Sequence, residues 1–355
     1  MSQSTWQGAL RSQAFEQKDS SMMNKKPTRN ALGDISNRTR SKTGQEPGWK
    51  KSGSSKPFAI AQTNSKASRP ASQSDSPQKQ RLFSNPQEPI DEIDKHDLGV
   101  PKYAAEYVAD IYKYYKDIEC RSVPAPDYMS KQTDINEKMR ALLIDWLCQV
   151  HNKFELVPAT LYLTVSLLDR FLEKKIVSRR KLQLVGCACM LLGSKYEEIY
   201  APELNDFVGM SDNAFTSEDL LRMEGVILNV LKFNLTVPTV YKFLRRYLKV
   251  LGASVKIQHH ATYIVERTLQ EYSVLKFMPS TVAASALMLA LRADNCEDDW
   301  DDIMERNTRY TPADLQECCQ ELVNVIRKGE SSYLQAVNKK YASSKYMNAS
   351  SIHLE

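Results

Sequence analysis

The sequence has few of the motifs that would support catalysis or a cross-linked fold. Its seven cysteines are scattered without a paired CxxC motif, and its 12 glycines form no phosphate-binding loop. There is no paired-histidine metal motif and no serine or cysteine nucleophile motif; the adjacent His259 and His260 would point in different directions on a helix. These absences argue against a disulfide framework and a structural zinc. We expect no catalytic residue, no metal and no cofactor.

Long hydrophobic runs are also missing. No apolar stretch is long enough to span a bilayer, and residues 1–18 lack the order of basic, apolar and small residues that marks a secretory signal. We therefore expect a soluble intracellular protein without a membrane partner, with its cysteines as reduced thiols in a core. The length of 355 residues allows two domains of ordinary size and an extension.

Positive charge is concentrated at the start of the chain. Residues 1–90 contain fifteen Lys and Arg against six Asp and Glu, a net of +9, whereas the remainder has 33 against 37, a net of −4. This first segment is rich in Ser, Gln and Pro and has no sustained helical or strand periodicity, so it cannot bury enough apolar surface to offset the cost of ordering. We predict that it is a disordered tail.

Helical signals dominate the rest of the sequence, and no strand pattern competes with them. A first amphipathic helix is predicted to begin at Pro101, because apolar residues then recur at helical spacing. These residues are Tyr103, Tyr107, Ile111, Tyr114 and Ile118. Later helix starts are predicted at capping residues or prolines, namely Asp134 with Glu137, Pro158, Ser178, and Thr216 with Asp219.

The helix predicted over residues 139–154 is apolar around an arc of roughly 200°, about twice the width needed to dock one face. One flank of this arc can face its own core. Met139, Leu142 and Trp146 then form a surplus ridge on the other flank. This ridge either binds a partner protein or packs against the N-terminal helix or the tail.

The helical pattern recurs later in the chain. Residues 182–192 are apolar almost all round, which is typical of a central helix surrounded by others. The segment 184–192 is echoed by 281–289 at an offset of 97, and the capped start at Thr216 is echoed at Thr311 at an offset of 95. The two similar offsets predict an all-α protein with a duplicated five-helix unit.

Several motifs in succession resemble those of the cyclin family. They are MRALLIDW at residues 139–146, LDRFL at 168–172, KLQLVG at 181–186 and SKYEEI at 194–199. DLG at 97–99, FLRR at 243–246 and KYASSK at 340–345 are similar to signatures of the mitotic B-type members. The resemblance covers about residues 90–345 and implies two tandem five-helix cyclin boxes. The domains expected from it are a disordered regulatory tail (1–95), an N-terminal helix and linker (96–133), a first box (134–236), a second box (237–330) and a C-terminal extension (331–355).

The resemblance implies a regulatory subunit, not an enzyme. Such a subunit binds and activates a cyclin-dependent protein kinase at the G2/M transition and in mitosis, in the nucleus and cytoplasm. By motif, Lys195 and Glu224 are the expected polar contacts to the kinase. From the residues alone, a lysine that extends into solvent at a helix end and a solvated glutamate would be the simpler interpretations. The expected apolar contacts are Leu192, Tyr196, Leu228, Phe233 and Leu235.

The resemblance also gives the surplus ridge a role in substrate recruitment. The corresponding surface in cyclins docks short motifs of substrates and inhibitors that contain a basic residue and leucine. Its residues here are Met139, Leu142, Trp146 and Gln183. Gln149 stands where some cyclins have an acidic residue, which weakens the expected preference for a basic motif.

Residues 29–37 in the tail resemble the destruction box that the anaphase-promoting ubiquitin ligase reads, which implies ubiquitin-dependent proteolysis. The same RxxL pattern occurs at Arg140, Arg179 and Arg245, but within predicted helices that a reader of extended peptides could not reach. The alternative is an incidental pattern in a basic tail. The residues expected to be read are Arg29, Leu32, Gly33, Asp34, Ile35 and Asn37.

Two further sites concern phosphate. Ser76 precedes Pro77, with Lys79 shortly after, which is the form that cyclin-dependent kinases phosphorylate. Arg245 and His259 resemble part of a phosphate-binding pocket of B-type cyclins, although Tyr263 replaces the expected lysine. The alternative for the latter two is a pair of exposed bases.

A cyclin-like fold also occurs in transcription factors that bind nucleic acid, so fold alone leaves that function open. Those factors usually carry a zinc ribbon and a basic folded core. This chain has no paired CxxC motif, and its residues after 90 are slightly acidic. We therefore expect no direct nucleic-acid partner.

Overall fold

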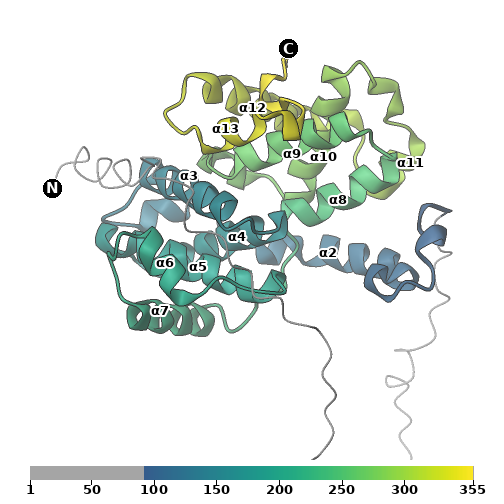
Figure 1. Ribbon diagram of the computed structural model, residues 1–355. Helices are drawn as coiled ribbons and strands as arrows, with labels where there is room; N and C mark the ends of the chain where they lie inside the picture. The colour runs from purple at the N-terminus through teal and green to yellow at the C-terminus, as the bar shows by residue number, and fades with distance from the viewer. Residues whose placement is uncertain (1–91, 355) are drawn as a thin grey trace, which may run out of the picture. The chain divides into compact units, whose positions relative to one another are not determined.

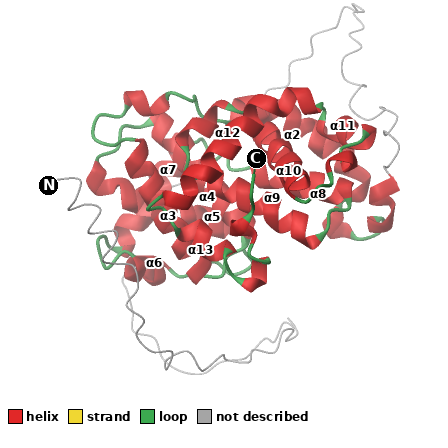
Figure 2. Ribbon diagram, turned by 90° about the horizontal axis from the view of Figure 1, so that it is seen from above, coloured by secondary structure: helices red, strands yellow, loops and turns green. Residues whose placement is uncertain are grey.

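The computed structural model describes residues 92–354, and these form helices and no strand (Figures 1 and 2). The predicted all-α class with two tandem five-helix boxes is confirmed. The predicted destruction box and Ser76 lie outside the described residues.

The first box comprises α3 (Glu137–Lys153), α4 (Pro158–Lys174), α5 (Leu182–Glu197), α6 (Leu204–Met210) and α7 (Ser217–Val230). The second comprises α8 (Val240–Leu251), α9 (Val255–Thr268), α10 (Pro279–Ala293), α11 (Asp302–Thr308) and α12 (Pro312–Ser331). They are preceded by α2 (Val108–Ser122) and followed by α13 (Ala336–Tyr341).

Each box is built around one central helix. In α5 every residue from Val185 to Ser194 is buried, because α3, α4, α6 and α7 all pack against it. In α10 every residue from Val282 to Leu291 is buried among α8, α9 and α12. Small residues allow this close approach: a Cβ on Gly186 would lie 2.9 Å from the Leu143 side chain. The central helices are therefore those that the sequence shows as apolar all round.

The two caps that revealed the repeat are present. Thr216 accepts a hydrogen bond from the Asp219 amide at 3.1 Å, and Asp219 accepts one from the Thr216 amide at 3.1 Å. Thr311 and Asp314 make the same reciprocal pair before α12. The hydrogen bonds from Thr216 lower the pKa of the Asp219 carboxyl. Because both caps depend only on residues three apart, local sequence is enough to predict them.

Two other predicted helix caps are wrong. The cap of α3 is Asn136, whose side chain accepts from the Met139 amide at 3.0 Å. Ser178 does stand before a 3-10 turn, Arg179–Lys181, that runs into α5 at Leu182, but its side chain makes no capping hydrogen bond. Asp134 instead accepts from the Arg179 amide at 2.9 Å and pairs with the Arg179 guanidinium at 2.6 Å. A carboxylate expected to cap its own helix thus anchors the start of another.

The N-terminal helix differs from its prediction in both start and orientation. Pro101 opens only a short 3-10 turn, and Ala104, at φ +46°, separates that turn from α2. The tyrosines expected to form the docked face, Tyr103, Tyr107 and Tyr114, are about half exposed. The docked face includes Glu119, which accepts from the amide and hydroxyl of Ser280 at the start of α10. Polar docking of this kind leaves no trace in hydrophobic periodicity.

A buried ion pair joins the helices of the first box and reaches the second. The Arg140 guanidinium binds both carboxylate oxygens of Asp169, at 2.6 and 2.7 Å, and donates to the Leu269 carbonyl at 3.1 Å. Tyr128 donates to Asp169 at 2.7 Å. Burial, and then the Asp169 charge, raises the pKa of the Tyr128 phenol, so it remains a donor. This cluster connects α3, α4 and the loop after α9.

Candidate functional site

Lys195 and Glu224 are brought together by the last turn of α5 and the middle of α7. The Lys195 ammonium lies 2.7 Å from a Glu224 carboxylate oxygen, and the lysine side chain is 47% exposed. The Glu224 side chain is only 13% exposed, so the pair reaches solvent through its lysine. The two predicted polar contacts therefore form one accessible site.

Apolar side chains surround this pair. Phe233 is 66% exposed and Tyr196 is 43% exposed, while Leu228 and Leu235 are half-buried. Lys232 and Phe233 both have left-handed backbone, at φ +52° and +56°, in the turn that follows α7. Such backbone in a non-glycine residue costs of order 1–3 kcal/mol and concentrates at functional sites.

One of the predicted apolar contacts is buried and does not lie at the surface. Leu192 is only 4% exposed, because it belongs to the part of α5 that is enclosed by the other helices of the box. It supports the end of α5 from within. After the first turn of this helix, side chains reach solvent again only from Lys195 onward.

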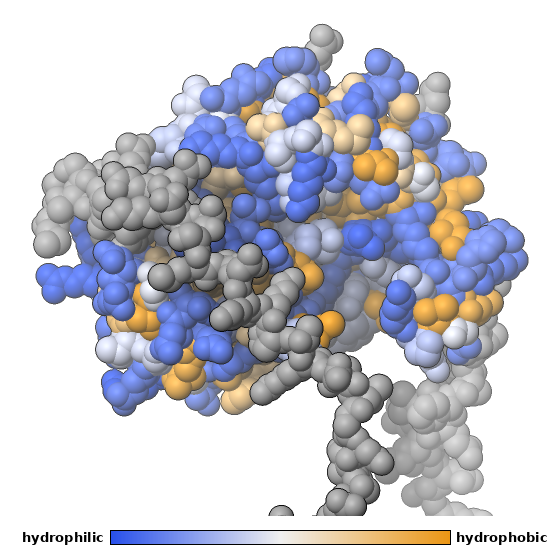
Figure 3. Space-filling view, viewed as in Figure 1, coloured by the Kyte–Doolittle hydropathy of each residue, from blue (hydrophilic) through white to orange (hydrophobic). Residues whose placement is uncertain are grey.

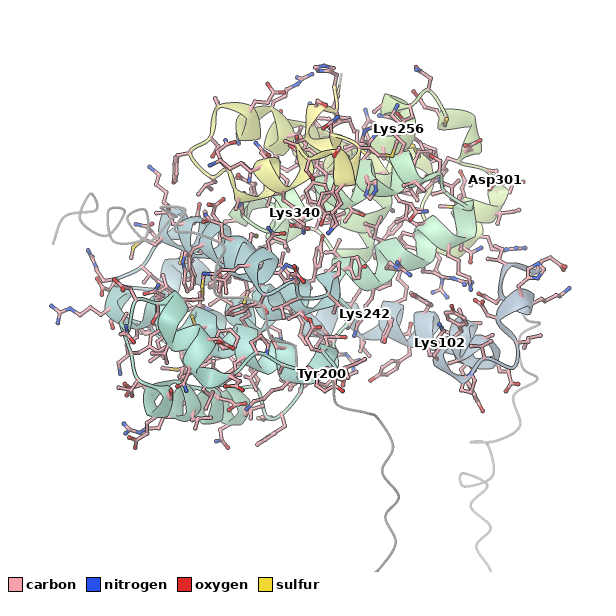
Figure 4. All side chains as sticks on the ribbon, in the orientation of Figure 1. Lys102, Tyr200, Lys242, Lys256, Asp301 and Lys340 are labelled. Atoms are coloured by element: carbon pink, nitrogen blue, oxygen red, sulfur yellow. The ribbon has the colours of Figure 1, made fainter. Side chains whose placement is uncertain are left out.

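The structure adds apolar residues that sequence reasoning missed. Ile199 and Tyr200, directly after α5, are 91% and 89% exposed. Their signal in the sequence is weak, since two apolar residues outside any periodic segment do not reveal whether they face a core. In Figure 4, Tyr200 is labelled at the lower edge of the first box.

The N-terminal helix borders the same surface. The Lys242 ammonium lies 5.7 Å from the centroid of the Tyr115 ring and 3.9 Å from the Glu197 carboxylate at the end of α5, so this helix approaches that end of α5. The exposed Tyr114 lies next to Tyr115, with 6.4 Å between ring centroids. Figure 3 shows hydrophobic side chains exposed among hydrophilic ones on the side in view. We call the set the apolar face: Tyr114, Tyr196, Ile199, Tyr200 and Phe233, with the Lys195–Glu224 pair among them.

The surplus ridge on α3 is less exposed than the sequence predicts. Met139, Leu142 and Trp146 are each at most 9% exposed. The chain itself contributes to this covering through α13, which packs on α3 and whose first amide, that of Ala336, donates to Asp145 at 2.9 Å. A contact 191 residues away in sequence could not be foreseen from the helix pattern.

A groove of about 920 Å³ remains beside this ridge. Leu142 and Trp146 line one side, and the segment from Tyr333 to Lys340 lines the other. Met139 and Gln183 are not among its lining residues; Gln183 is half-buried in the first turn of α5. The structure thus brings two of the four predicted docking residues to one groove, and substrate docking stays a prediction.

The three residues of the predicted phosphate pocket have different surroundings. Arg245 is exposed on α8. His259 is half-buried and packs edge-on against the Tyr346 ring at 5.6 Å. Tyr263 is buried and donates to the Asn338 side chain at 3.0 Å, so it does not present a group where the lysine was expected. Phosphate binding by Arg245 and His259 stays a prediction.

Residues 92–354 contain no cluster of three or more His, Cys, Asp and Glu arranged to hold a metal ion. In the same part of the chain, every helix is too short or too polar to cross a membrane.

Comparisons with known proteins agree with the two-box architecture. The cyclin N-terminal domain matches residues 110–236, and the cyclin C-terminal domain matches residues 238–355. Cyclin-B2-1 of Oryza sativa subsp. japonica is 47% identical over 255 residues, which are 72% of this chain and 61% of that protein. G2/mitotic-specific cyclin-1 of Medicago sativa subsp. varia is 45% identical over 72% of this chain and 60% of that protein. The matched region thus spans about three fifths of the length of these relatives.

A solved structure shows the same fold. The viral cyclin from herpesvirus saimiri matches with a TM-score of 0.55 and 22% sequence identity, covering 61% of this chain and 96% of that chain.

Proposed function

This chain belongs to the cyclin family, and we propose that it is a B-type regulatory subunit that binds and activates a cyclin-dependent protein kinase at the G2/M transition and in mitosis. It would perform no chemistry itself and would act in the nucleus and cytoplasm. The observation that carries this proposal is the apolar face around the Lys195–Glu224 pair. Large exposed apolar side chains beside a charged pair are typical of a protein interface.

The geometry is suited to holding a mobile element of the kinase. Protein kinases are active only when the Glu of their helix αC is paired with the catalytic Lys and the activation loop is ordered. Apart from Tyr114 on α2, the apolar face lies at the end of α5 and in the segments that directly follow α5 and α7, next to the buried part of the first box. Binding to the active kinase arrangement more tightly than to the inactive one shifts the population toward activity.

We expect the purified chain to raise the peptide-phosphorylating activity of at least one cyclin-dependent kinase by orders of magnitude. The measurement mixes the chain with each candidate kinase and follows phosphate transfer to a short peptide. A variant with Phe233→Ser, which removes an exposed ring without opening the core, should activate less. If every candidate kinase stayed at its basal rate while circular dichroism showed a folded chain, the proposal would fail.

The nucleic-acid alternative is not favoured, because the matched relatives named above are B-type cyclins.

For substrates and inhibitors, we propose that short motifs dock at the groove beside Leu142 and Trp146. Leucine side chains of a motif would meet Trp146, and the exposed Lys339 at the opposite wall would favour an acidic flanking residue. Lys340 is already paired with Glu266 at 2.7 Å.

The anaphase-promoting ubiquitin ligase is the proposed partner of residues 29–37. We expect that deleting these nine residues lengthens the half-life of the chain at mitotic exit several-fold, because the ligase loses its recognition motif. A degradation assay in mitotic extract measures this half-life. Deleting residues 58–66, an equal length of the same tail, should leave turnover unchanged. Equal half-lives for the intact chain and the first deletion would refute this part of the proposal.

A further inference from the structure

A basic pocket lies between the N-terminal helix and the second box. Its volume is about 320 Å³, and α2, α8 and the end of α11 line it. Figure 1 shows these three elements gathered at one end of the second box. Five of the eleven described residues in the lining are cationic, and none of the eleven is Asp or Glu. The five are Lys113, Lys116, Arg246, Arg306 and Arg309.

Two of the five cations are paired with carboxylates that do not belong to the lining. Asp94 lies 2.8 Å from the Arg246 guanidinium, and Glu119 lies 3.2 Å from the Lys116 ammonium. These contacts hold the two cations in place without contributing a negative group to the lining. Lys116 is further fixed by donating to the Ser280 hydroxyl at 2.8 Å. The lining is therefore an organised set of cationic donors, which favours an anion with several acceptor oxygens.

The pocket also has an aromatic wall. Tyr112 of α2 and Phe243 of α8 both line it, with 6.4 Å between their ring centroids. Aromatic walls of this kind bind proline rings in extended peptides. A ligand that combines an anionic group with an adjacent proline would thus meet both features of the pocket.

The first described residues of the chain lie at the pocket. The described chain begins at Glu92, and two residues later Asp94 is paired with Arg246 in the pocket wall. Ser76 precedes Asp94 by eighteen residues, and a chain of that length can span up to about 60 Å. Ser76 is followed by Pro77 and preceded by Asp75, so its phosphorylated form would carry two neighbouring anions and a proline.

We propose that this basic pocket binds Ser76 of the same chain once Ser76 is phosphorylated. Phosphoserine carries about two negative charges at pH 7 and three acceptor oxygens. Arg306 and Arg309 would bind those oxygens, and Pro77 would pack on the aromatic wall. The source of the phosphate rests on the proposed function: the kinase transfers the γ-phosphoryl group of ATP to the Ser76 hydroxyl oxygen. ADP leaves, and the hydroxyl proton passes to the catalytic base of the kinase.

The test uses a fluorescent synthetic peptide of residues 70–82, with and without phosphate on Ser76. It is titrated against the full chain carrying Ser76→Ala, so that its own tail cannot compete. We expect the phosphorylated peptide to bind at least ten times more tightly than the unphosphorylated one.

Arg306→Gln and Arg309→Gln should each weaken the binding of the phosphorylated peptide about tenfold. The control variant Lys328→Gln, which removes an exposed charge on α12, should leave the peptide binding unchanged. Two variants are needed because Arg309 has left-handed backbone, whereas Arg306 lies within α11.

A second arm separates the tail from other sources of phosphate. The full chain phosphorylated on Ser76 should bind the added peptide at least tenfold more weakly than the Ser76→Ala chain, because its own tail occupies the pocket. Equal affinity for the two peptide forms, no effect of either arginine variant, or equal binding of an unrelated phosphoserine peptide would overturn the proposal. Because the peptide is synthetic, these outcomes do not depend on kinase activation.

Discussion

Replacing Lys195 with alanine is expected to weaken binding to a cyclin-dependent kinase by about ten- to a hundredfold while the chain stays folded. A charge-assisted hydrogen bond contributes about 1.5–3 kcal/mol, which corresponds to that range of affinity. Lys195 is half exposed, so its removal opens no cavity in the isolated chain. Surface plasmon resonance with immobilised kinase measures the affinity.

The matched control is Arg222→Ala. Arg222 lies on the neighbouring α7, is exposed, and has its own carboxylate partner in Glu218 at 2.7 Å. The Arg222→Ala variant should bind the kinase with the same affinity as the unmodified chain. Wild-type affinity for Lys195→Ala would contradict the assignment of this pair to the interface. A double variant, Lys195→Ala with Glu224→Ala, shows whether the two side chains act together, because coupled residues give a combined loss that differs from the sum.

Replacing Arg140 with leucine is expected to lower the free energy of unfolding by about 3–5 kcal/mol, the range for removing one partner of a buried ion pair. Arg140 and Asp169 are almost completely buried, so the remaining carboxylate would have no charge partner in an apolar surrounding. Urea unfolding followed by circular dichroism measures the change. Because Arg140 also donates to the Leu269 carbonyl, we expect the contact between the two boxes to weaken as well.

Two controls identify the cause of that loss. Arg222→Leu breaks an exposed pair and should change the free energy of unfolding by about 1 kcal/mol or less. Combining Arg140→Leu with Asp169→Leu removes both charges, so part of the stability should return. The explanation is wrong if Arg140→Leu costs no more than Arg222→Leu.

The candidate site could be predicted from the sequence only in part. The resemblance to cyclins predicts Lys195 and Glu224 as polar contacts, and the structure places their charged groups 2.7 Å apart. The exposure of Phe233 depends on the turn after α7, and that of Ile199 and Tyr200 on the chain leaving α5 without returning to the core. Neither turn can be deduced from periodicity, which reports which residues share a side of a helix and not which side faces a core.

The sequence by itself determined the helical class, the central helices α5 and α10, and the capped starts of α7 and α12. These features follow from hydrogen bonds and side-chain spacing within a few residues, where the local chain is the whole environment. Only the tertiary structure decided that Asp134 anchors Arg179, that Glu119 docks α2 onto α10, and that Asp145 accepts from the first amide of α13. Each of these contacts joins residues 45 to 191 positions apart. They depend on the packing of the whole chain, because a polar group finds its partner only where folding has brought one within hydrogen-bonding distance.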